Sequence, residues 1–363
     1  MRILHLLPHL SGGGAERQFS YLAPELVRMG HSVHVAYLSE GPMGPALAGV
    51  TLHPLVARNN YDPYLFWQIF RLMRQIKPDI IHTWILQMDI LGGIAASFNR
   101  IPWILREPCS AIAYPWAWKF HLRILIGSMS NAIVSNSSGG DEYWKTRLPY
   151  SHRYIIPNAV LVDEIDDNIT NIPLVSKMPE SPIILHAGRL ADAQKRPKAF
   201  LEVLSYVRQQ ENFVGILCGE GSQRSELELL KHKFGLDDNV NFTGNIPGKT
   251  LWALMKKASV FVSLSAYEGC PNTVMEAMAC GCPLVVSDIP AHREILDESC
   301  ALFVDPVNIQ QTANTIVWAL KHSESLRNQV EIAKRKTQEW SITKMACNYE
   351  KIYDDVIFRS TAT

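Results

Sequence analysis

The chain of 363 residues has no net charge and no long hydrophobic run. Its 35 Lys and Arg balance 35 Asp and Glu, so a polyanionic partner such as nucleic acid is not indicated. No apolar stretch reaches the roughly 20 residues of a membrane-spanning helix, and we expect the chain not to cross a bilayer by itself. The apolar residues 1–10 are interrupted by Pro8 and two histidines, which indicates a buried first strand rather than a signal peptide.

The seven cysteines lack the spacing of a disulfide framework, which a chain of this size does not need. Cys280 and Cys282 lie close together, but no second pair of similar spacing accompanies them, so no metal site is predicted. Free thiols predict a cytoplasmic protein.

Charge is unevenly distributed along the chain. Residues 1–160 carry 14 Lys and Arg against 9 Asp and Glu, and the remainder carries 21 against 26. A mildly basic first half favours a phosphate-bearing acceptor or an anionic membrane surface, although scattered surface charge explains it equally well. Residues 114–127 mix aromatic and basic side chains, which fits either peripheral membrane contact or a helix packed in the core.

Short apolar runs alternate with helical segments in two series. The strands expected are residues 2–7, 32–38, 50–55, 79–83, 103–106, 131–135 and 154–156, then 183–187, 213–218, 240–243, 260–264, 283–286 and 301–304. Helices are expected between them, including residues 15–29, 63–76, 116–128, 197–209, 222–234, 249–257 and 272–279, and from 309 to 358. This alternation predicts parallel sheets covered on both faces.

The length suits two domains with separate cores. We predict an α/β fold of two Rossmann-like, doubly wound domains, the first at 1–160 and the second at 182–340, with a polar linker at 161–181. Ligand crevices are expected at the carboxyl ends of the strands. Two such crevices facing a central cleft would enclose a substrate from both sides.

Three glycines follow the first expected strand, in residues 11–16. Gly13 and Gly14 let backbone amides approach a ligand, and the start of the next helix favours an anion. Neither the dinucleotide fingerprint nor the lysine of a P-loop is present, so a structural turn fits nearly as well.

Two cations, Arg189 and Lys195, lie on the loop after the first strand of the second series. Such a pair suits a diphosphate, whose charge grows as a nucleotide departs. A solvated surface loop explains them equally well from this motif alone.

The most informative segment is residues 266–276, which follow an apolar strand and open a helix. The backbone amides of Asn272, Thr273 and Val274 are expected to point from the helix start towards a phosphate. Glu268 precedes the helix, and Glu276 lies inside it among apolar residues, where a buried carboxylate requires a partner. Each carboxylate is suited to binding hydroxyl groups.

Together these segments resemble glycosyltransferase family 4, the retaining glycosyltransferases of the GT-B fold. The resemblance covers essentially the whole chain, and it implies an acceptor-binding domain at 1–160 and a nucleotide-sugar-binding domain at 182–340. It rests on residues 13–16, 157–160, 188–190 with Lys195, 219–221, 242–244, Glu268-x7-Glu276 and 276–288.

The resemblance implies a role for each matching residue of the second domain. Arg189 and Lys195 would bind the donor diphosphate as catalytic groups. Glu268 would contact the transferred sugar, and Glu276 the ribose hydroxyls.

The remaining donor contacts come from two glycine-containing loops. The loop of Gly244, Asn245 and Ile246 would flank the base, and Gly13 and Gly14 would approach the donor phosphate and the acceptor from the opposite domain. The resemblance also implies front-face substitution that needs no protein nucleophile, metal or other cofactor. The segment 341–363 would cross back to the first domain.

One departure concerns a histidine that many relatives carry after the fifth strand. Pro108 stands at that position, so Arg106 and Glu107 are the candidates for replacing its contact with the sugar. His82, at another strand end, is expected to be structural.

The predicted partners are a nucleotide-sugar donor, with UDP the expected nucleotide from family frequency, and a glycan or lipid-linked acceptor. A hexose or N-acetylhexosamine would be transferred in cell-surface polysaccharide or glycolipid assembly. A sugar-nucleotide epimerase shares the architecture, but no acid/base pair for proton transfer at carbon is evident. A catalytically inactive nucleotide-sugar-binding protein is the non-enzymatic alternative. A dehydrogenase is disfavoured because the glycine fingerprint is missing.

Overall fold

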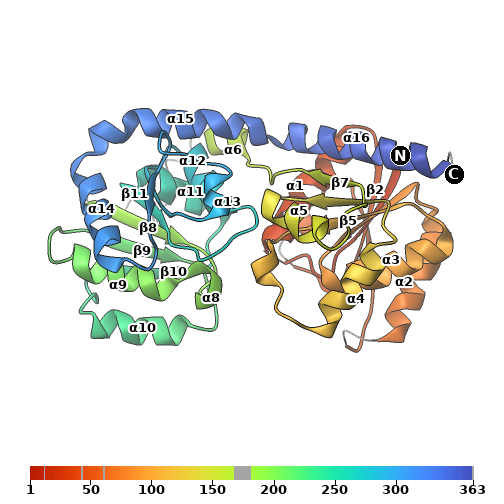
Figure 1. Ribbon diagram of the computed structural model, residues 1–363, viewed down its shortest axis with the longest axis horizontal. Coiled ribbons are helices and arrows are strands. Elements are labelled where there is room, and N and C mark those ends of the chain that lie inside the picture. The colour runs from red at the N-terminus through yellow and green to blue at the C-terminus, as the bar shows by residue number, and fades with distance from the viewer. Residues whose placement is uncertain (12, 42–43, 60–61, 167–180, 362–363) are drawn as a thin grey trace. The chain divides into compact units, whose positions relative to one another are not determined.

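The computed structural model describes residues 1–11, 13–41, 44–59, 62–166 and 181–361 (Figure 1). The chain forms two compact units. Unit 1 comprises Met1–Ala159 and Ile342–Thr363, and unit 2 comprises Val160–Ser341. The last helix, α16 (Ile342–Thr361), therefore belongs to unit 1 although it follows unit 2 in the sequence.

The sheet of unit 1 has seven parallel strands in the order β3-β2-β1-β4-β5-β6-β7. Their bounds are β1 (Arg2–Leu6), β2 (Ser32–Tyr37), β3 (Thr51–Pro54), β4 (Ile80–Trp84), β5 (Trp103–Glu107), β6 (Ala132–Ser135) and β7 (Arg153–Ile155). Because successive side chains of a strand point to opposite faces, Ile3 and Leu4 lie in two different cores.

Helices cover both faces of this sheet. The core that contains Ile3 is closed by α1 (Gly14–Arg28) and α16. The core that contains Leu4 is closed by α2 (Pro63–Ile76), α3 (Leu86–Asn99), α4 (Trp118–Gly127) and α5 (Ser138–Lys145). Two short 3-10 helices, η1 (Gly44–Ala46) and η2 (Ala111–Ala113), lie in the connections.

Unit 2 repeats the architecture with six parallel strands in the order β10-β9-β8-β11-β12-β13. The strands are β8 (Ile183–Ala187), β9 (Val214–Cys218), β10 (Val240–Gly244), β11 (Val260–Ser263), β12 (Leu284–Ser287) and β13 (Leu302–Val304). One core includes α9 (Pro197–Val207), α10 (Arg224–Lys233) and α14 (Ile309–Lys321). The other includes α11 (Gly248–Lys257), α12 (Asn272–Ala279) and α15 (Arg327–Thr337). Shorter helices are α8 (Asp192–Lys195), α13 (Pro290–Arg293), η3 (Ser323–Leu326) and η4 (Gln338–Trp340).

The predicted fold class is confirmed: both sheets are parallel, covered on two faces and ordered as in the Rossmann fold. In each sheet the strand order reverses beside the first strand, between β1 and β4 and between β8 and β11. The loops that follow β1, β8 and β11 leave the sheets at these reversal points. Ligand crevices of doubly wound sheets form at such places.

The expected linker at 161–181 begins as a helix. Its first residues form α6 (Val162–Asp166), and Val162 and Ile165 are buried in the core of unit 2. Apolar residues three apart lie on one face of a helix, but two residues are too short a pattern to reveal one. The remainder of the expected linker, residues 167–180, lies outside the described residues.

The cysteines and the helix lengths can be compared with the expectations from composition. All seven cysteines are free thiols. Across the described ranges, no helix combines the length and the apolar character required to cross a membrane.

Candidate functional site

The centre of the candidate site is an ion pair at the carboxyl ends of β8 and β11. Lys195 ends α8, which follows β8, and Glu268 lies on the loop after β11. The Nζ atom of Lys195 is 2.6 Å from Oε1 of Glu268, with the two side chains 17% and 5% exposed. The strand-end geometry thus brings together two residues that are 73 positions apart in the sequence.

Two further donors fix the Glu268 carboxylate. Ser265 Oγ donates to Oε1 at 2.6 Å, and Gln194 Nε2 donates to Oε2 at 3.0 Å. The two loops are also joined by a backbone hydrogen bond from Ala266 N to Gln194 O. The carboxylate is therefore held in one orientation by both loops. Neither Ser265 nor Gln194 was predicted as part of the site.

Two buried histidines lie close enough to the ion pair for its charges to act on their pKa values. His186, on β8, has Nδ1 3.0 Å from Val262 O, and burial lowers its pKa to about 4. His292, on α13, has Nδ1 2.8 Å from Ser287 O, and burial again lowers its pKa. In each, Nδ1–H donates to a carbonyl oxygen and the ring stays neutral at neutral pH. The sequence analysis missed both histidines. For His186, a histidine inside the apolar run 183–187 was a signal that could have revealed it.

Close backbone packing shapes the loop that carries Arg189. Gly188 N donates to Cys218 O and Leu190 N donates to Glu220 O, at 2.9 and 3.0 Å. A Cβ atom on Gly219, whose φ is +132°, would lie 2.0 Å from Gly188 O. Only glycine permits this approach, which explains the Gly-Glu-Gly motif as a contact between two loops. Arg189 itself is exposed.

The predicted base-flanking loop follows β10, next to the loop of Gly219. Gly244 adopts φ +69°, a left-handed conformation, and its carbonyl accepts from Gly219 N at 2.9 Å. Asn245 is exposed, and Ile246 is partly buried against the core. Backbone hydrogen bonds thus join the loop of Gly219 to the loop of Arg189 on one side and to the loop of Gly244 on the other.

The start of α12 is where the sequence analysis placed a phosphate contact. Asn272 N donates to Cys270 O and Val274 N donates to Pro271 O, both at 3.0 Å. Two of the three amides expected to point at a phosphate thus donate to carbonyl groups that directly precede the helix, and the phosphate contact stays a prediction. Thr273 lies between them and is partly exposed. Glu276 is buried inside the helix, 4% exposed, as its apolar neighbours predicted.

Gly13 and Gly14 lie at the start of α1 in unit 1, after β1. A Cβ atom on Gly13 would be 2.2 Å from Oε2 of Glu16, so this glycine makes room for the Glu16 carboxylate. A carboxylate in the first turn complements the positive end of the helix. The predicted approach of a donor phosphate to Gly13 and Gly14 would therefore meet a negative charge already in place.

Arg106 or Glu107 was expected to contact the sugar, but both side chains are buried. As neighbours on β5 they point to opposite faces of the sheet. Arg106, 2% exposed, donates to Asn158 Oδ1 at 2.6 Å and to Tyr349 OH at 3.2 Å. It thereby links Asn158 to α16, and its guanidinium lies 4.4 Å from the Trp84 ring centroid.

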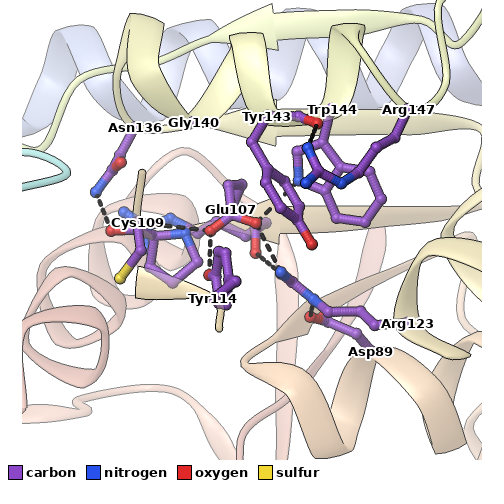
Figure 2. Close-up of polar contacts among 12 residues, drawn as sticks. Asp89, Glu107, Cys109, Tyr114, Arg123, Asn136, Gly140, Tyr143, Trp144 and Arg147 are labelled. Atoms are coloured by element: carbon purple, nitrogen blue, oxygen red, sulfur yellow. Dashed lines mark hydrogen bonds and ion pairs between the residues drawn. The ribbon is translucent and has the colours of Figure 1, made fainter. Parts of the chain in front are cut away.

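Glu107 is fully buried on the other face, within the network drawn in Figure 2. Its carboxylate accepts from Arg123 Nη1 at 2.6 Å, from Trp144 Nε1 and Cys109 N at 2.9 Å each, and from Tyr114 OH. Four donors fill the acceptor sites of a carboxylate. We therefore replace the predicted sugar contact with a structural role.

Arg123 joins two buried carboxylates. Besides Glu107 it donates through Nε to Asp89 Oδ2 at 2.7 Å, and Thr83 Oγ1 donates to Asp89 Oδ1. All three ionic side chains are 1% exposed or less. Burial, partly offset by Arg123, raises the pKa of Asp89 to about 6. Arg123, Asp89 and Glu107 are here called the Arg123 network, and their ion pairs connect α4 to α3 and to β5.

The pKa of Asp89 leads to a testable dependence on pH. A carboxyl group whose pKa is higher in the folded than in the unfolded state takes up a proton on folding at intermediate pH, so acidification favours folding. We expect the unfolding free energy of the wild type, relative to Asp89→Asn, to rise as the pH falls from neutral through about 6. Urea unfolding of both proteins at a series of pH values measures this. A difference that stays constant would contradict the assignment.

His82 is buried on β4, and its Nδ1 lies 2.8 Å from the hydroxyl of Tyr353 on α16. Burial holds its pKa well below the ordinary value. This matches the structural role expected for it. Among the described residues, no group of three or more His, Cys, Asp or Glu is placed to hold a metal ion.

Two family descriptions match most of the chain between them. "Glycosyltransferase Family 4" matches residues 12–164, and "Glycosyl transferases group 1" matches residues 169–336. The first match begins after β1 and covers β2 to β7 of unit 1, and the second covers β8 to β13 of unit 2.

Individual proteins agree with this. An uncharacterized glycosyltransferase of Methanocaldococcus jannaschii is 32% identical over 334 residues, 85% of this chain and 84% of the relative. A Campylobacter jejuni relative, named as an α-1,4-N-acetyl-D-galactosaminyltransferase acting on a diNAcBac-PP-undecaprenol-linked glycan, is 26% identical over 290 residues, 77% of each chain. The crystal structure of Anabaena HepE with UDP-glucose has a TM-score of 0.85 at 18% identity, covering 98% of this chain and 100% of HepE. The chain is therefore a glycosyltransferase of the GT-B fold and belongs to glycosyltransferase family 4.

Proposed function

We propose that the enzyme transfers a hexose or N-acetylhexosamine, with retention of configuration, from a UDP-sugar to a glycan or lipid-linked acceptor in cell-surface polysaccharide or glycolipid assembly. The observation that carries the proposal is the Lys195–Glu268 pair, 2.6 Å apart at the reversal point of the second sheet. Exposed Arg189 follows the same strand, and buried Glu276 lies on the helix after Glu268.

The cations would act on the leaving group. As the bond between the anomeric carbon and the diphosphate breaks, negative charge grows on the diphosphate oxygen, and Arg189 and Lys195 would stabilise it. Preformed charges cost little reorganisation during the reaction, which makes this the largest contribution that we assign to the protein. We propose that these two side chains make a metal ion or other cofactor unnecessary.

Glu268 would bind hydroxyl groups of the sugar rather than attack it. Its carboxylate already accepts from Lys195, Ser265 and Gln194, and a carboxylate held by three donors is a weak nucleophile. In front-face substitution the acceptor oxygen bonds to the anomeric carbon on the face from which the diphosphate leaves. The acceptor's proton passes to a diphosphate oxygen. Glu276 would hold the ribose hydroxyls.

The relatives support the choice of substrates. HepE is described in complex with UDP-glucose, and the Campylobacter jejuni relative is named for an undecaprenol diphosphate-linked acceptor. The free thiols of all seven cysteines support a reducing, cytoplasmic location.

The test is incubation with a panel of labelled UDP-sugars and undecaprenyl diphosphate-linked glycans, with the product linkage determined by NMR. We expect transfer that retains the donor's anomeric configuration and continues in the presence of EDTA. An altered sugar formed without acceptor would instead indicate an epimerase. Nucleotide-sugar binding without turnover would indicate an inactive binding protein, and inversion would overturn the proposed mechanism.

A further inference from the structure

Large apolar side chains are exposed along η2 and α4 of unit 1. Ile112 is 70% exposed, Trp116 87%, Trp118 58% and Leu125 65%. Soluble proteins rarely leave several large apolar side chains uncovered close together unless the surface binds something. These four residues are here called the α4 surface.

The Arg123 network holds this segment from the inside. Arg123 lies on α4 itself and is bound to Asp89 and Glu107, and Tyr114, between η2 and α4, donates to Glu107 (Figure 2). The inner side of the segment is thereby fastened to the sheet. The tryptophans on its outer side belong to a firmly attached element rather than to a loose loop.

The neighbouring helices carry exposed aromatic residues too. In Figure 1, α2, α3 and α4 lie in one layer of unit 1, and α3 packs against both of the others. Tyr64 and Trp67 on α2 are 60% and 56% exposed, and Phe98 on α3 is 72% exposed. Phe66 of α2 contacts Phe98 across the two helices, with ring centroids 6.4 Å apart.

The exposed charge of this layer is mostly positive. Residues 108–140 contain no Asp or Glu, and residues 63–107 contain only Asp79, Asp89 and Glu107. The last two of these are buried in the Arg123 network. The exposed cations of the layer and its connections are Arg71, Arg74, Lys77, Arg100 and Lys119.

We propose that the α4 surface, with the exposed residues of α2 and α3, docks the enzyme on an anionic lipid bilayer. Tryptophan and tyrosine favour the boundary between lipid and water, and cations beside them are attracted to anionic headgroups. A second copy of this chain is a poor partner, because a two-fold contact would bring the same positive residues together. The inference goes beyond the proposed reaction and does not depend on it.

Vesicle sedimentation tests the proposal without donor or acceptor. The wild type should sediment with phosphatidylcholine–phosphatidylglycerol vesicles and much less with phosphatidylcholine alone, and salt should weaken the binding. Trp116→Ser with Trp118→Ser should lower the partition coefficient about tenfold. Lys119→Glu, which reverses one charge, should lower it at least about fivefold.

Matched controls lie elsewhere on unit 1. Tyr150, 97% exposed, and Lys351, exposed on α16, are outside the layer, so Tyr150→Ser and Lys351→Glu should bind like the wild type. Circular dichroism and the urea midpoint check the fold of every variant. The proposal fails if the wild type does not bind the anionic vesicles, or if the double tryptophan variant binds equally well. It also fails if that variant's main effect, by analytical ultracentrifugation, is to dissociate a dimer.

Discussion

Lys195→Ala is expected to lower kcat/KM for sugar transfer about a thousandfold, the upper range for loss of one preformed group that stabilises transition-state charge. The Lys195 side chain is only 17% exposed, and its Nζ atom lies 2.6 Å from Oε1 of Glu268. A positive charge so placed acts in a medium of lower polarity than water and is correspondingly effective. Its removal also leaves the buried Glu268 without its cation. Initial rates at varied donor concentration measure the loss.

Lys198→Ala is the matched control for this variant. Lys198 lies three residues further along and pairs with Glu226 at 2.7 Å, but both side chains are well exposed, 33% and 53%. Exposed pairs of this kind contribute little, so transfer should stay within about twofold of the wild type. If Lys195→Ala kept more than about a tenth of the activity across donors, the site assignment would be wrong.

The same experiment extends to Glu268. Glu268→Gln keeps the shape of the side chain and removes its charge, and we expect activity to fall about a hundredfold. Residues that act as a unit show strongly non-additive losses. A double variant of Lys195 and Glu268 should therefore be little worse than Lys195→Ala alone. Full additivity would show that the two side chains act separately.

The strands were readable from the sequence because a parallel sheet buried on both faces requires short, continuous apolar runs. All thirteen expected strands are present, with bounds that differ by at most one residue. The runs are separated by helices of ordinary length, so few alternative registers exist.

Besides the shorter helices α6, α8 and α13, the sequence analysis missed α3 and α5, because glycines weaken their helical pattern. In α3, a Cβ on Gly92 would lie 2.4 Å from Leu6 and one on Gly93 2.6 Å from Trp103. In α5, a Cβ on Gly140 would lie 3.0 Å from Cys109 O. These glycines let the helices pack closely on the sheet. Glycine disfavours a helix in isolation, so their benefit exists only in the assembled fold.

The candidate site was predicted in part. The strand-end rule placed Lys195 and Glu268 near one another, but their direct contact and the support from Ser265 and Gln194 depend on side-chain directions that a sequence does not contain. The same limit produced the error at Arg106 and Glu107. Because side chains alternate along β5, Arg106 faces α16 and Glu107 faces α4. The replacement of a family histidine by Pro108 does not reveal these directions.

Arg123→Met is expected to lower the free energy of unfolding by about 3–5 kcal/mol, the usual cost of removing one partner from a buried ionic group. Arg123 lies between Asp89 and Glu107, 2.7 and 2.6 Å from their oxygens. Methionine fills much of the space but leaves two carboxylates without a cation in the core of unit 1. Urea unfolding at neutral pH measures the loss.

Arg28→Met provides the comparison within the same unit. Arg28 pairs with Glu25 at 2.6 Å, but its side chain is 66% exposed, so the loss should stay below about 1 kcal/mol. Adding Asp89→Asn and Glu107→Gln to Arg123→Met removes the uncompensated charges and should recover part of the stability. Acidification should narrow the gap between Arg123→Met and the wild type for the same reason, because protonated carboxyl groups no longer require the guanidinium. A gap that does not change with acidification would show that Arg123 stabilises unit 1 through packing rather than through its charge.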